Sequence, residues 1–221
     1  MRYKTVLFDL DGTLLNTLGD LHSAVNFALR GHGFPERTLP EIRSFVGHGI
    51  RNLIERSVPA GTPQDAIASC LCAFQAEYNR HMNVLTCPYD GVIDLLRRLR
   101  EQGVRTAVVS NKYDSAAKAL VEAHFAGLID MCLGALENVP SKTAPDTTNM
   151  ILDAFGLAPA EAAYVGDSGV DCATAANAKL PFFGVSWGFW DRDRLAESGA
   201  QRICDSAGEL LAALTGDTTR E

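Results

Sequence analysis

Two aspartates stand near the start of this 221-residue chain, directly after a short apolar run. That run, residues 5–8, is rich in strand-forming residues and predicts a parallel strand buried on both faces. Asp9 and Asp11 follow it one residue apart, and Gly12 lets the backbone turn at once. One carboxylate here could attack phosphorus, and a second could exchange a proton with the departing alcohol and the incoming water. The same pattern is also typical of a solvated turn, so the rest of the chain must decide.

Further polar residues follow later apolar runs or precede a later helix: Ser110, Asn111, Lys112, Lys142, Asp167 and Asp171. Because the carboxyl ends of parallel strands lie on one side of a sheet, we expect these residues to meet Asp9 and Asp11 in one cleft. Four carboxylates so close together raise one another's pKa or recruit a cation. Oxygen ligands with room for water and a phosphate favour Mg²⁺. Lys142, Ser110 and Asn111 could then bind the phosphoryl oxygens.

The elements that must position these side chains follow from the hydrophobic pattern. From about residue 85 onward, apolar strands alternate with amphipathic helices, which is typical of a mostly parallel sheet with helices on both faces. Residues 16–84 show only helical periodicity, with a capping box at Thr38-Leu39-Pro40-Glu41. The predicted fold is a doubly wound, Rossmann-like α/β core of residues 1–15 and 85–221, with an inserted all-helical cap of residues 16–84. Placed after the first strand, this cap would overhang the catalytic edge as a lid.

The composition argues against several classes of protein. The chain has 20 basic and 27 acidic side chains and a net charge of −7, whereas binding a nucleic-acid backbone needs a basic face. Its six cysteines are scattered without a Cys-x-x-Cys pair, which favours free thiols in a reducing cytosol over a zinc site or a disulfide framework. No segment has the length and apolarity of a signal peptide or a membrane span. We therefore expect a cytoplasmic protein that acts on a small molecule, and its oligomeric state stays open.

In order and spacing, these residues resemble the four motifs of the haloacid dehalogenase superfamily of phosphohydrolases. The motifs are Asp9-Leu10-Asp11-Gly12-Thr13, Ser110, Lys142 and Gly166-Asp167-Ser168-Gly169-Val170-Asp171. The resemblance covers nearly the whole chain, and the helical insertion is similar to that superfamily's α-helical cap. Three further segments look most like its phosphoglycolate phosphatase branch: residues 45–51, 110–112 and 184–188.

The resemblance implies a role for each carboxylate. Asp9 would be the nucleophile, and Asp11 would be the general acid and base. Asp9, the backbone carbonyl of Asp11 and Asp167 would bind Mg²⁺, and Asp171 would support the metal shell.

The resemblance also implies that Ser110, Asn111 and Lys142 bind phosphate, with Lys142 counted among the catalytic residues. One departure concerns this lysine, because the family commonly has proline after it and here Lys142 precedes Thr143. That difference leaves Lys112 as a rival cation for the same role.

The leading hypothesis is a Mg²⁺-dependent phosphatase that hydrolyses small phosphomonoesters, above all 2-phosphoglycolate, through an aspartyl-phosphate. Within the cap, Arg51 follows the Gly47-His48-Gly49 turn at the start of a predicted helix. There it could bind a substrate carboxylate, or it is simply a solvated helix residue.

Three alternatives stay open. A sugar phosphomutase of the same family would share every catalytic residue and would differ in whether water reaches the aspartyl-phosphate. A haloacid dehalogenase would use one aspartate and no metal, and Asp11 argues against it. A phospho-acceptor signalling domain would receive phosphate from a partner, but such a domain needs no large helical cap.

Overall fold

The computed structural model describes residues 3–216, which form two compact units. The first unit is built from the chain up to Leu15 and from Pro88 onward, and the second is residues 16–87. The helical insertion expected from the sequence ended at residue 84, so the second boundary lies three residues later.

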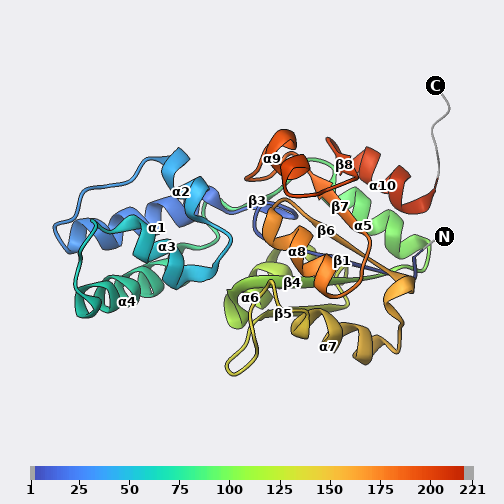
Figure 1. Cartoon of the computed structure of the whole chain (residues 1–221), viewed down its shortest axis with the longest axis horizontal. Coiled ribbons are helices and arrows are strands. Elements are labelled where there is room, and N and C mark those ends of the chain that lie inside the picture. The colour runs from blue at the N-terminus through green and yellow to red at the C-terminus, as the bar shows by residue number, and fades with distance from the viewer. Residues whose placement is uncertain (1–2, 217–221) are drawn as a thin grey trace. The chain divides into compact units, whose positions relative to one another are not determined.

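A six-stranded sheet forms the centre of the first unit, in the order β5-β4-β1-β6-β7-β8 (Figure 1). Its strands are β1 (Thr5–Phe8), β4 (Arg105–Tyr113), β5 (Met131–Ala135), β6 (Ala162–Gly166), β7 (Phe182–Val185) and β8 (Ile203–Cys204). Each pair of neighbouring strands is parallel. All four residues of β1 are buried, which explains why its sequence is apolar throughout rather than alternating. The predicted doubly wound α/β core is confirmed.

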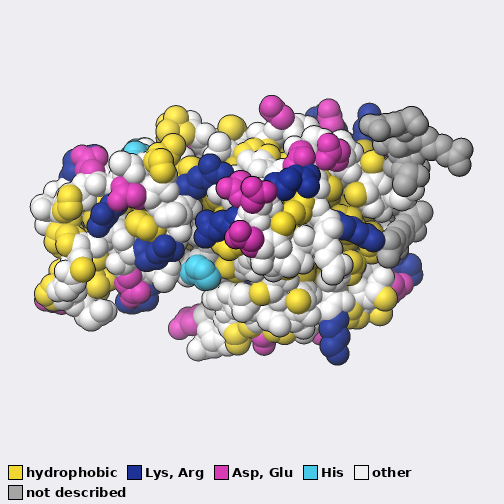
Figure 2. Space-filling view, turned by 45° about the horizontal axis from the view of Figure 1, so that its top comes forward, with side chains coloured by type: hydrophobic (Ala, Val, Ile, Leu, Met, Phe, Trp, Pro, Cys, Tyr) yellow, Lys and Arg dark blue, Asp and Glu magenta, His cyan; other side chains and the backbone are white. Residues whose placement is uncertain are grey.

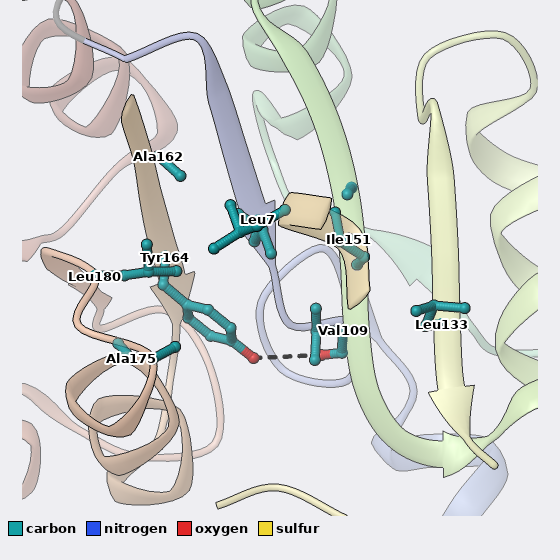
Figure 3. Packing of buried hydrophobic residues seen from close by; sticks show 11 residues of the cluster. Leu7, Val109, Leu133, Ile151, Ala162, Tyr164, Ala175 and Leu180 are labelled. Carbon is teal, nitrogen blue, oxygen red and sulfur yellow. Dashed lines mark hydrogen bonds between the residues drawn. The ribbon is translucent and has the colours of Figure 1, made fainter. Parts of the chain in front are cut away.

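Helices cover both faces of this sheet. They are α5 (Val92–Glu101), α6 (Asp114–Phe125), α7 (Asp146–Phe155), α8 (Gly169–Asn177), α9 (Arg192–Glu197) and α10 (Ala207–Thr215), with a short 3₁₀ helix at Pro159–Glu161. Figure 3 shows Leu7, Val109 and Tyr164 extending from the three central strands to pack against α7 and α8. Because side chains alternate along a strand, Phe8 and Val108 point to the opposite face. There α5 packs against β4, and α10 packs against α5 (Figure 1).

Strand β4 is longer than the sequence predicted. The apolar run of residues 106–109 predicts a strand that ends at Val109 and is followed by a turn, but β4 continues through Ser110, Asn111 and Lys112 to Tyr113. Its pairing with β5 shifts register between Val109 and Tyr113. An irregularity of this kind re-aims side chains and is common beside active sites. The polar side chains obscured the strand because they interrupt its apolar pattern.

Two short elements at the far edge of the sheet were not predicted. Helix α9 has six residues and β8 has two, which is too short for a hydrophobic period to be recognised.

The second unit contains four helices within the described residues: α1 (Leu18–Gly31), α2 (Leu39–Phe45), α3 (Gly49–Ser57) and α4 (Gln64–His81). Helix α1 packs most extensively against α4. The predicted capping box opens α2, because the Thr38 hydroxyl accepts from Glu41 N–H and the Glu41 carboxylate accepts from Thr38 N–H at 2.7 Å. The connecting segments pair as a two-stranded sheet of β2 (Leu15–Asn16) and β3 (Cys87–Pro88).

A buried carboxylate explains why this unit extends beyond residue 84. Asp20, which is 4 % exposed, accepts hydrogen bonds from the N–H groups of Val84, Leu85 and Thr86 at 2.9–3.1 Å. The Thr86 hydroxyl donates a further bond to it at 2.7 Å. Leu85 also packs against Gly19, where a Cβ atom would lie 3.0 Å from the leucine side chain. These contacts attach residues 84–86 to α1 although their sequence carries no helical pattern.

The surface shows no concentration of basic charge on the face drawn in Figure 2, where acidic and basic side chains are interspersed. Among the helices of residues 3–216, none has both the length and the apolarity needed to cross a membrane.

Candidate active site

Two neighbouring strands bring Asp9 and Asp167 to the same edge of the sheet. Phe8, the last residue of β1, is paired with Val165 of β6, and Asp9 N–H donates to the Val165 carbonyl at 2.9 Å. The two aspartates therefore leave the sheet side by side. Together with Asp171 they form a cluster in which one carboxylate oxygen of each residue lies within 4.8 Å of the others.

Asp9 is held through one of its two carboxylate oxygens. Its Oδ1 accepts from Leu10 N–H at 2.7 Å and lies 2.8 Å from Lys142 Nζ. Burial, followed by the charge of Asp171, raises the pKa of Asp9 to about 7, and the charge of Lys142 opposes that rise. Among the described residues, none hydrogen-bonds to Oδ2 of Asp9. That oxygen is the one available to attack an electrophile.

Lys142 is a buried cation at the centre of this arrangement. Besides Asp9, its Nζ lies 2.7 Å from Asp171 Oδ1, 3.1 Å from the Val109 carbonyl and 3.2 Å from the Tyr164 hydroxyl. Burial alone would lower the pKa of Lys142, but the charges of Asp171 and Asp9 raise it well above its usual value. An ammonium has three N–H donors, and these acceptors already engage them. Lys142 therefore holds the predicted nucleophile in place, and its contact with a phosphate stays a prediction.

The predicted phosphate ligands Ser110 and Asn111 support the two lysines. Asn111 Nδ2 donates to the Lys142 carbonyl at 3.2 Å, and Lys142 N–H donates to Asn111 Oδ1 at 2.9 Å. The buried Ser110 hydroxyl accepts from Lys112 N–H at 3.2 Å. These contacts place both residues in the site, and their binding of phosphate stays a prediction.

Asp11 is paired with a different lysine from Asp9. Lys112 Nζ lies 2.9 Å and 3.2 Å from the two carboxylate oxygens of Asp11. The side chains are 3 % and 13 % exposed, respectively. From the sequence, Lys112 is a rival of Lys142 for the same role. In the structure Lys112 pairs with Asp11, whereas Lys142 pairs with Asp9 and Asp171.

Asp167 is enclosed by groups from two separate segments, residues 12–13 and residues 188–189. It is 1 % exposed, and it accepts from the Thr13 hydroxyl at 3.2 Å and from Phe189 N–H at 2.7 Å. Burial, followed by the charges of neighbouring aspartates, raises the pKa of Asp167 well above its ordinary value. Gly12 and Gly188 make the enclosure possible, because a Cβ atom on either would lie 2.3 or 2.5 Å from Asp167 Oδ2.

Residues 6–185 of the chain match the family described as haloacid dehalogenase-like hydrolase. The chain belongs to this family. Phosphoglycolate phosphatase from Thiobacillus denitrificans is 32% identical over 220 residues, with 96% of each chain covered. The enzyme of the same name from Aliivibrio fischeri is 30% identical, again over 96% of each chain. The chain is therefore a hydrolase of the phosphoric monoester class.

A solved structure supports the same assignment. The crystal structure of a candidate phosphoglycolate phosphatase from Lactobacillus delbrueckii subsp. bulgaricus matches with a TM-score of 0.92 and 33% identity. The match covers 97% of this chain and 99% of that one. The CbbY protein from Rhodobacter sphaeroides, solved in complex with phosphate, matches with a TM-score of 0.78 and 25% identity.

The donor set of this haloacid dehalogenase-like site fits a divalent cation. Four carboxylates face two buried lysines: Asp9, Asp11, Asp167 and Asp171 against Lys112 and Lys142. The excess of two negative charges in a largely buried site matches one divalent cation. The raised pKa values of Asp9 and Asp167 are what crowded buried carboxylates show without such compensation. Oxygen ligands of this kind favour Mg²⁺ over softer metals.

The predicted metal ligands and Asp171 differ in whether their carboxylate oxygens already accept hydrogen bonds or form ion pairs within the protein. Asp171 accepts from Lys142 at 2.7 Å and from the Ser168 hydroxyl at 2.6 Å, which suits the supporting position expected for it. The Asp11 carboxylate is engaged by Lys112, so Asp11 would bind a metal only through its backbone carbonyl, as the resemblance implies. A metal site on Asp9, Asp11 and Asp167 stays a prediction.

Arg51 belongs to the helical unit, where its Nη1 lies 3.7 Å from Glu55 Oε1 one turn along α3. The arginine side chain is 61 % exposed, so this pair is a weak surface interaction. The predicted contact of Arg51 with a substrate carboxylate stays a prediction.

Sequence reasoning did not select Thr13, Tyr164 or Gly188 as site residues. Tyr164 carries the only polar side-chain group of residues 162–165. A hydroxyl in an otherwise apolar strand is the one feature of the sequence that could have indicated its place in the site. Thr13 closes the first motif, but nothing in its type predicts a bond to Asp167. Gly188 becomes visible only when the close approach of its backbone to Asp167 is known.

Proposed function

We propose that the chain is a Mg²⁺-dependent phosphatase that hydrolyses small phosphomonoesters through an aspartyl-phosphate intermediate, with 2-phosphoglycolate as the leading substrate. The observation that carries the proposal is the separate pairing of two adjacent carboxylates, Asp9 with Lys142 and Asp11 with Lys112. Such a pairing gives the two acids different environments, and two chemical roles need that difference.

In this mechanism Asp9 Oδ2 attacks the phosphorus atom, and the bond from phosphorus to the alcohol oxygen breaks. Asp11, in its protonated form, donates a proton to the departing oxygen. The Asp11 carboxylate then takes a proton from water, whose oxygen attacks phosphorus and releases Asp9. The net reaction converts the ester and water into an alcohol and phosphate, and it leaves both aspartates as they began.

The remaining residues of the site orient these two aspartates. Lys142 fixes Asp9 Oδ1, so the attacking oxygen is presented in one direction. Asp9, Asp167 and the backbone carbonyl of Asp11 would hold Mg²⁺, with Asp171 behind them. When bound, the ion would offset the repulsion between Asp9 and the phosphate and stabilise charge that develops on the phosphoryl oxygens.

We assign substrate selection to a cap formed by residues 16–84, within the helical unit. The chemistry needs only the phosphoryl group, so another part of the protein must recognise the remainder of the substrate. Arg51 at the start of α3 offers a guanidinium suited to a carboxylate. The names of the relatives in Thiobacillus and Aliivibrio favour 2-phosphoglycolate, which carries a carboxylate next to its phosphate. A small phosphorylated metabolite in a reducing cytoplasm is the proposed setting, without a nucleic-acid partner.

A panel of phosphate esters tests this proposal. Free phosphate would be measured with Mg²⁺ and 2-phosphoglycolate, glycerol 3-phosphate, phenyl phosphate or glucose 1-phosphate, and the Asp9→Asn protein would control for contaminating phosphatases. We expect the highest kcat/KM for 2-phosphoglycolate and no activity in Asp9→Asn. Conversion of glucose 1-phosphate to its isomer without phosphate release would indicate a mutase. Absence of phosphate release from every ester would contradict the proposal.

A further inference from the structure

Lys112 is a buried cation that has no role in the mechanism proposed for Asp9 and Asp11. Its Nζ lies within 3.2 Å of both oxygens of Asp11, and its side chain is 3 % exposed. We infer that Lys112 is a positioning residue that fixes the orientation of the Asp11 carboxylate for proton exchange, and that it does not bind the substrate phosphate. This inference rests on the proposed function.

The contact of Nζ with both oxygens restricts the Asp11 side chain more than a single bond would. A terminal carboxylate otherwise rotates over a broad range of χ2 values, and Asp11 stands directly before the turn that begins at Gly12. A pair that is this well buried is also screened little by salt. Proton transfer requires the acid to lie within hydrogen-bond reach of the reacting oxygen, so a fixed orientation contributes directly to the rate.

The backbone that presents Lys112 is itself held in place. It lies in the irregular part of β4, where Lys112 N–H donates to the Ser110 hydroxyl at 3.2 Å. Gly134 of β5 packs directly against this segment, because a Cβ atom there would lie 2.5 Å from the Lys112 carbonyl and 2.5 Å from Asp114 Cα. The backbone of Lys112 is therefore fixed, so its side chain is suited to hold another side chain in one orientation.

The division of contacts between the two lysines separates positioning from phosphate binding. Lys142 contacts Asp9, the nucleophile, and Lys112 contacts Asp11, the proton-exchanging group. If Lys112 acts through Asp11, its loss should matter only while Asp11 can exchange a proton. If it binds phosphate, its loss should matter whatever stands at position 11.

Leaving-group dependence tests this distinction. A p-nitrophenolate leaves without protonation, whereas an alkoxide needs an acid. For Lys112→Met we expect a loss of kcat/KM of roughly 10- to 100-fold on glycerol 3-phosphate and a several-fold smaller loss on p-nitrophenyl phosphate. The Asp11→Asn protein should show the same pattern. Equal losses of Lys112→Met on both esters would overturn the inference.

A double-mutant cycle gives a second, independent readout. In the Asp11→Asn background, Lys112→Met should change kcat/KM on glycerol 3-phosphate by less than about twofold, because coupled residues are not additive. A further loss equal to that in the wild-type background would overturn the inference. Lys118→Met is the matched control, since Lys118 pairs with Asp114 on the exposed surface of α6 and should leave kcat/KM unchanged.

Folding and activity of each variant are measured separately. Far-UV circular dichroism and Tm identify a variant that does not fold, and Lys112→Gln, which keeps a polar donor, then replaces Lys112→Met in both tests. Failure of the proposed function appears as wild-type protein that releases no phosphate from any ester. Failure of the inference appears as active wild-type protein in which Lys112 and Asp11 act independently.

Discussion

Asp9 and Asp11 are two positions apart in the sequence but are held by different parts of the fold. Lys142 reaches Asp9 from the loop before α7, whereas Lys112 reaches Asp11 from β4. The pattern at the strand ends predicted that these residues would gather in one place. It could not predict which lysine contacts which aspartate, because both lysines were expected at the same carboxyl-terminal edge of the sheet.

The outcome of that pairing depends on two local features. One is the register shift of β4 beyond Val109. The other is the hydrogen bond that the Tyr164 hydroxyl donates to the Val109 carbonyl (Figure 3). The same carbonyl also accepts from Lys142. The register shift produces no hydrophobic period or motif, and the Tyr164 hydroxyl indicates a buried polar contact without identifying its partner.

Gly188 provides a test of the packing around Asp167. In Gly188→Ala, the added Cβ would lie 2.2 Å from the Gly12 carbonyl and 2.4 Å from Asp167 Cβ. We expect Asp167 to be displaced, with a loss of stability of about 1–3 kcal/mol and a higher Mg²⁺ concentration for half-maximal activity. Gly208→Ala is the control, since its Cβ would meet only Ser206 Oγ at 3.9 Å. An unchanged Mg²⁺ requirement in Gly188→Ala would contradict this account of the enclosure.

Arg51 tests the proposed recognition of a carboxylate. Arg51→Ala should raise KM for 2-phosphoglycolate much more than KM for phenyl phosphate, because only the first substrate carries a carboxylate. Loss of a charge-assisted hydrogen bond costs roughly 1.5–3 kcal/mol, about ten- to a hundredfold in kcat/KM. Arg43→Ala, which removes an exposed arginine of α2, serves as the control. Equal effects on both substrates would remove Arg51 from substrate recognition.

At the scale of secondary-structure elements, the alternation of apolar strands and amphipathic helices was sufficient to predict the core. The pattern of residues 146–155 predicts a helix and that of residues 182–185 predicts a strand, and α7 and β7 have these bounds. The end of the helical unit was predicted three residues early. Residues 84–86 belong to it through hydrogen bonds to a single side chain, Asp20, and such bonds leave no periodic trace.

Asp20 therefore provides a test at this scale. In Asp20→Asn, one carboxylate oxygen becomes an NH₂ group, which cannot accept from the N–H groups of residues 84–86. We expect a loss of stability of about 1–3 kcal/mol, seen as a lower Tm, and faster amide hydrogen exchange at Leu85 and Thr86. Asp65→Asn is the control, because Asp65 is exposed in the first turn of α4. Unchanged exchange at residues 84–86 would show that Asp20 does not anchor them.

At the scale of the whole molecule, the excess of buried negative charge predicts dependence on a divalent cation. Activity should disappear with EDTA and return with Mg²⁺, while Ca²⁺ should support little, because its longer bonds and higher coordination number allow it to take both oxygens of Asp9. Mg²⁺ alone should also raise Tm, since a ligand that binds only the folded state stabilises it. Asp167→Asn should weaken both effects. Full activity after exhaustive chelation would contradict the metal site.

The proposed mechanism requires that Asp9 carries the phosphoryl group during turnover. The most direct measurement uses the Asp11→Asn protein, in which loss of the base slows release of phosphate from the enzyme. After incubation with Mg²⁺ and p-nitrophenyl phosphate, whose leaving group needs no acid, borohydride reduction converts an aspartyl-phosphate to homoserine, which mass spectrometry can locate. We predict homoserine at position 9 and nowhere else. Continued turnover without modification at position 9, or modification at another aspartate, would contradict the account.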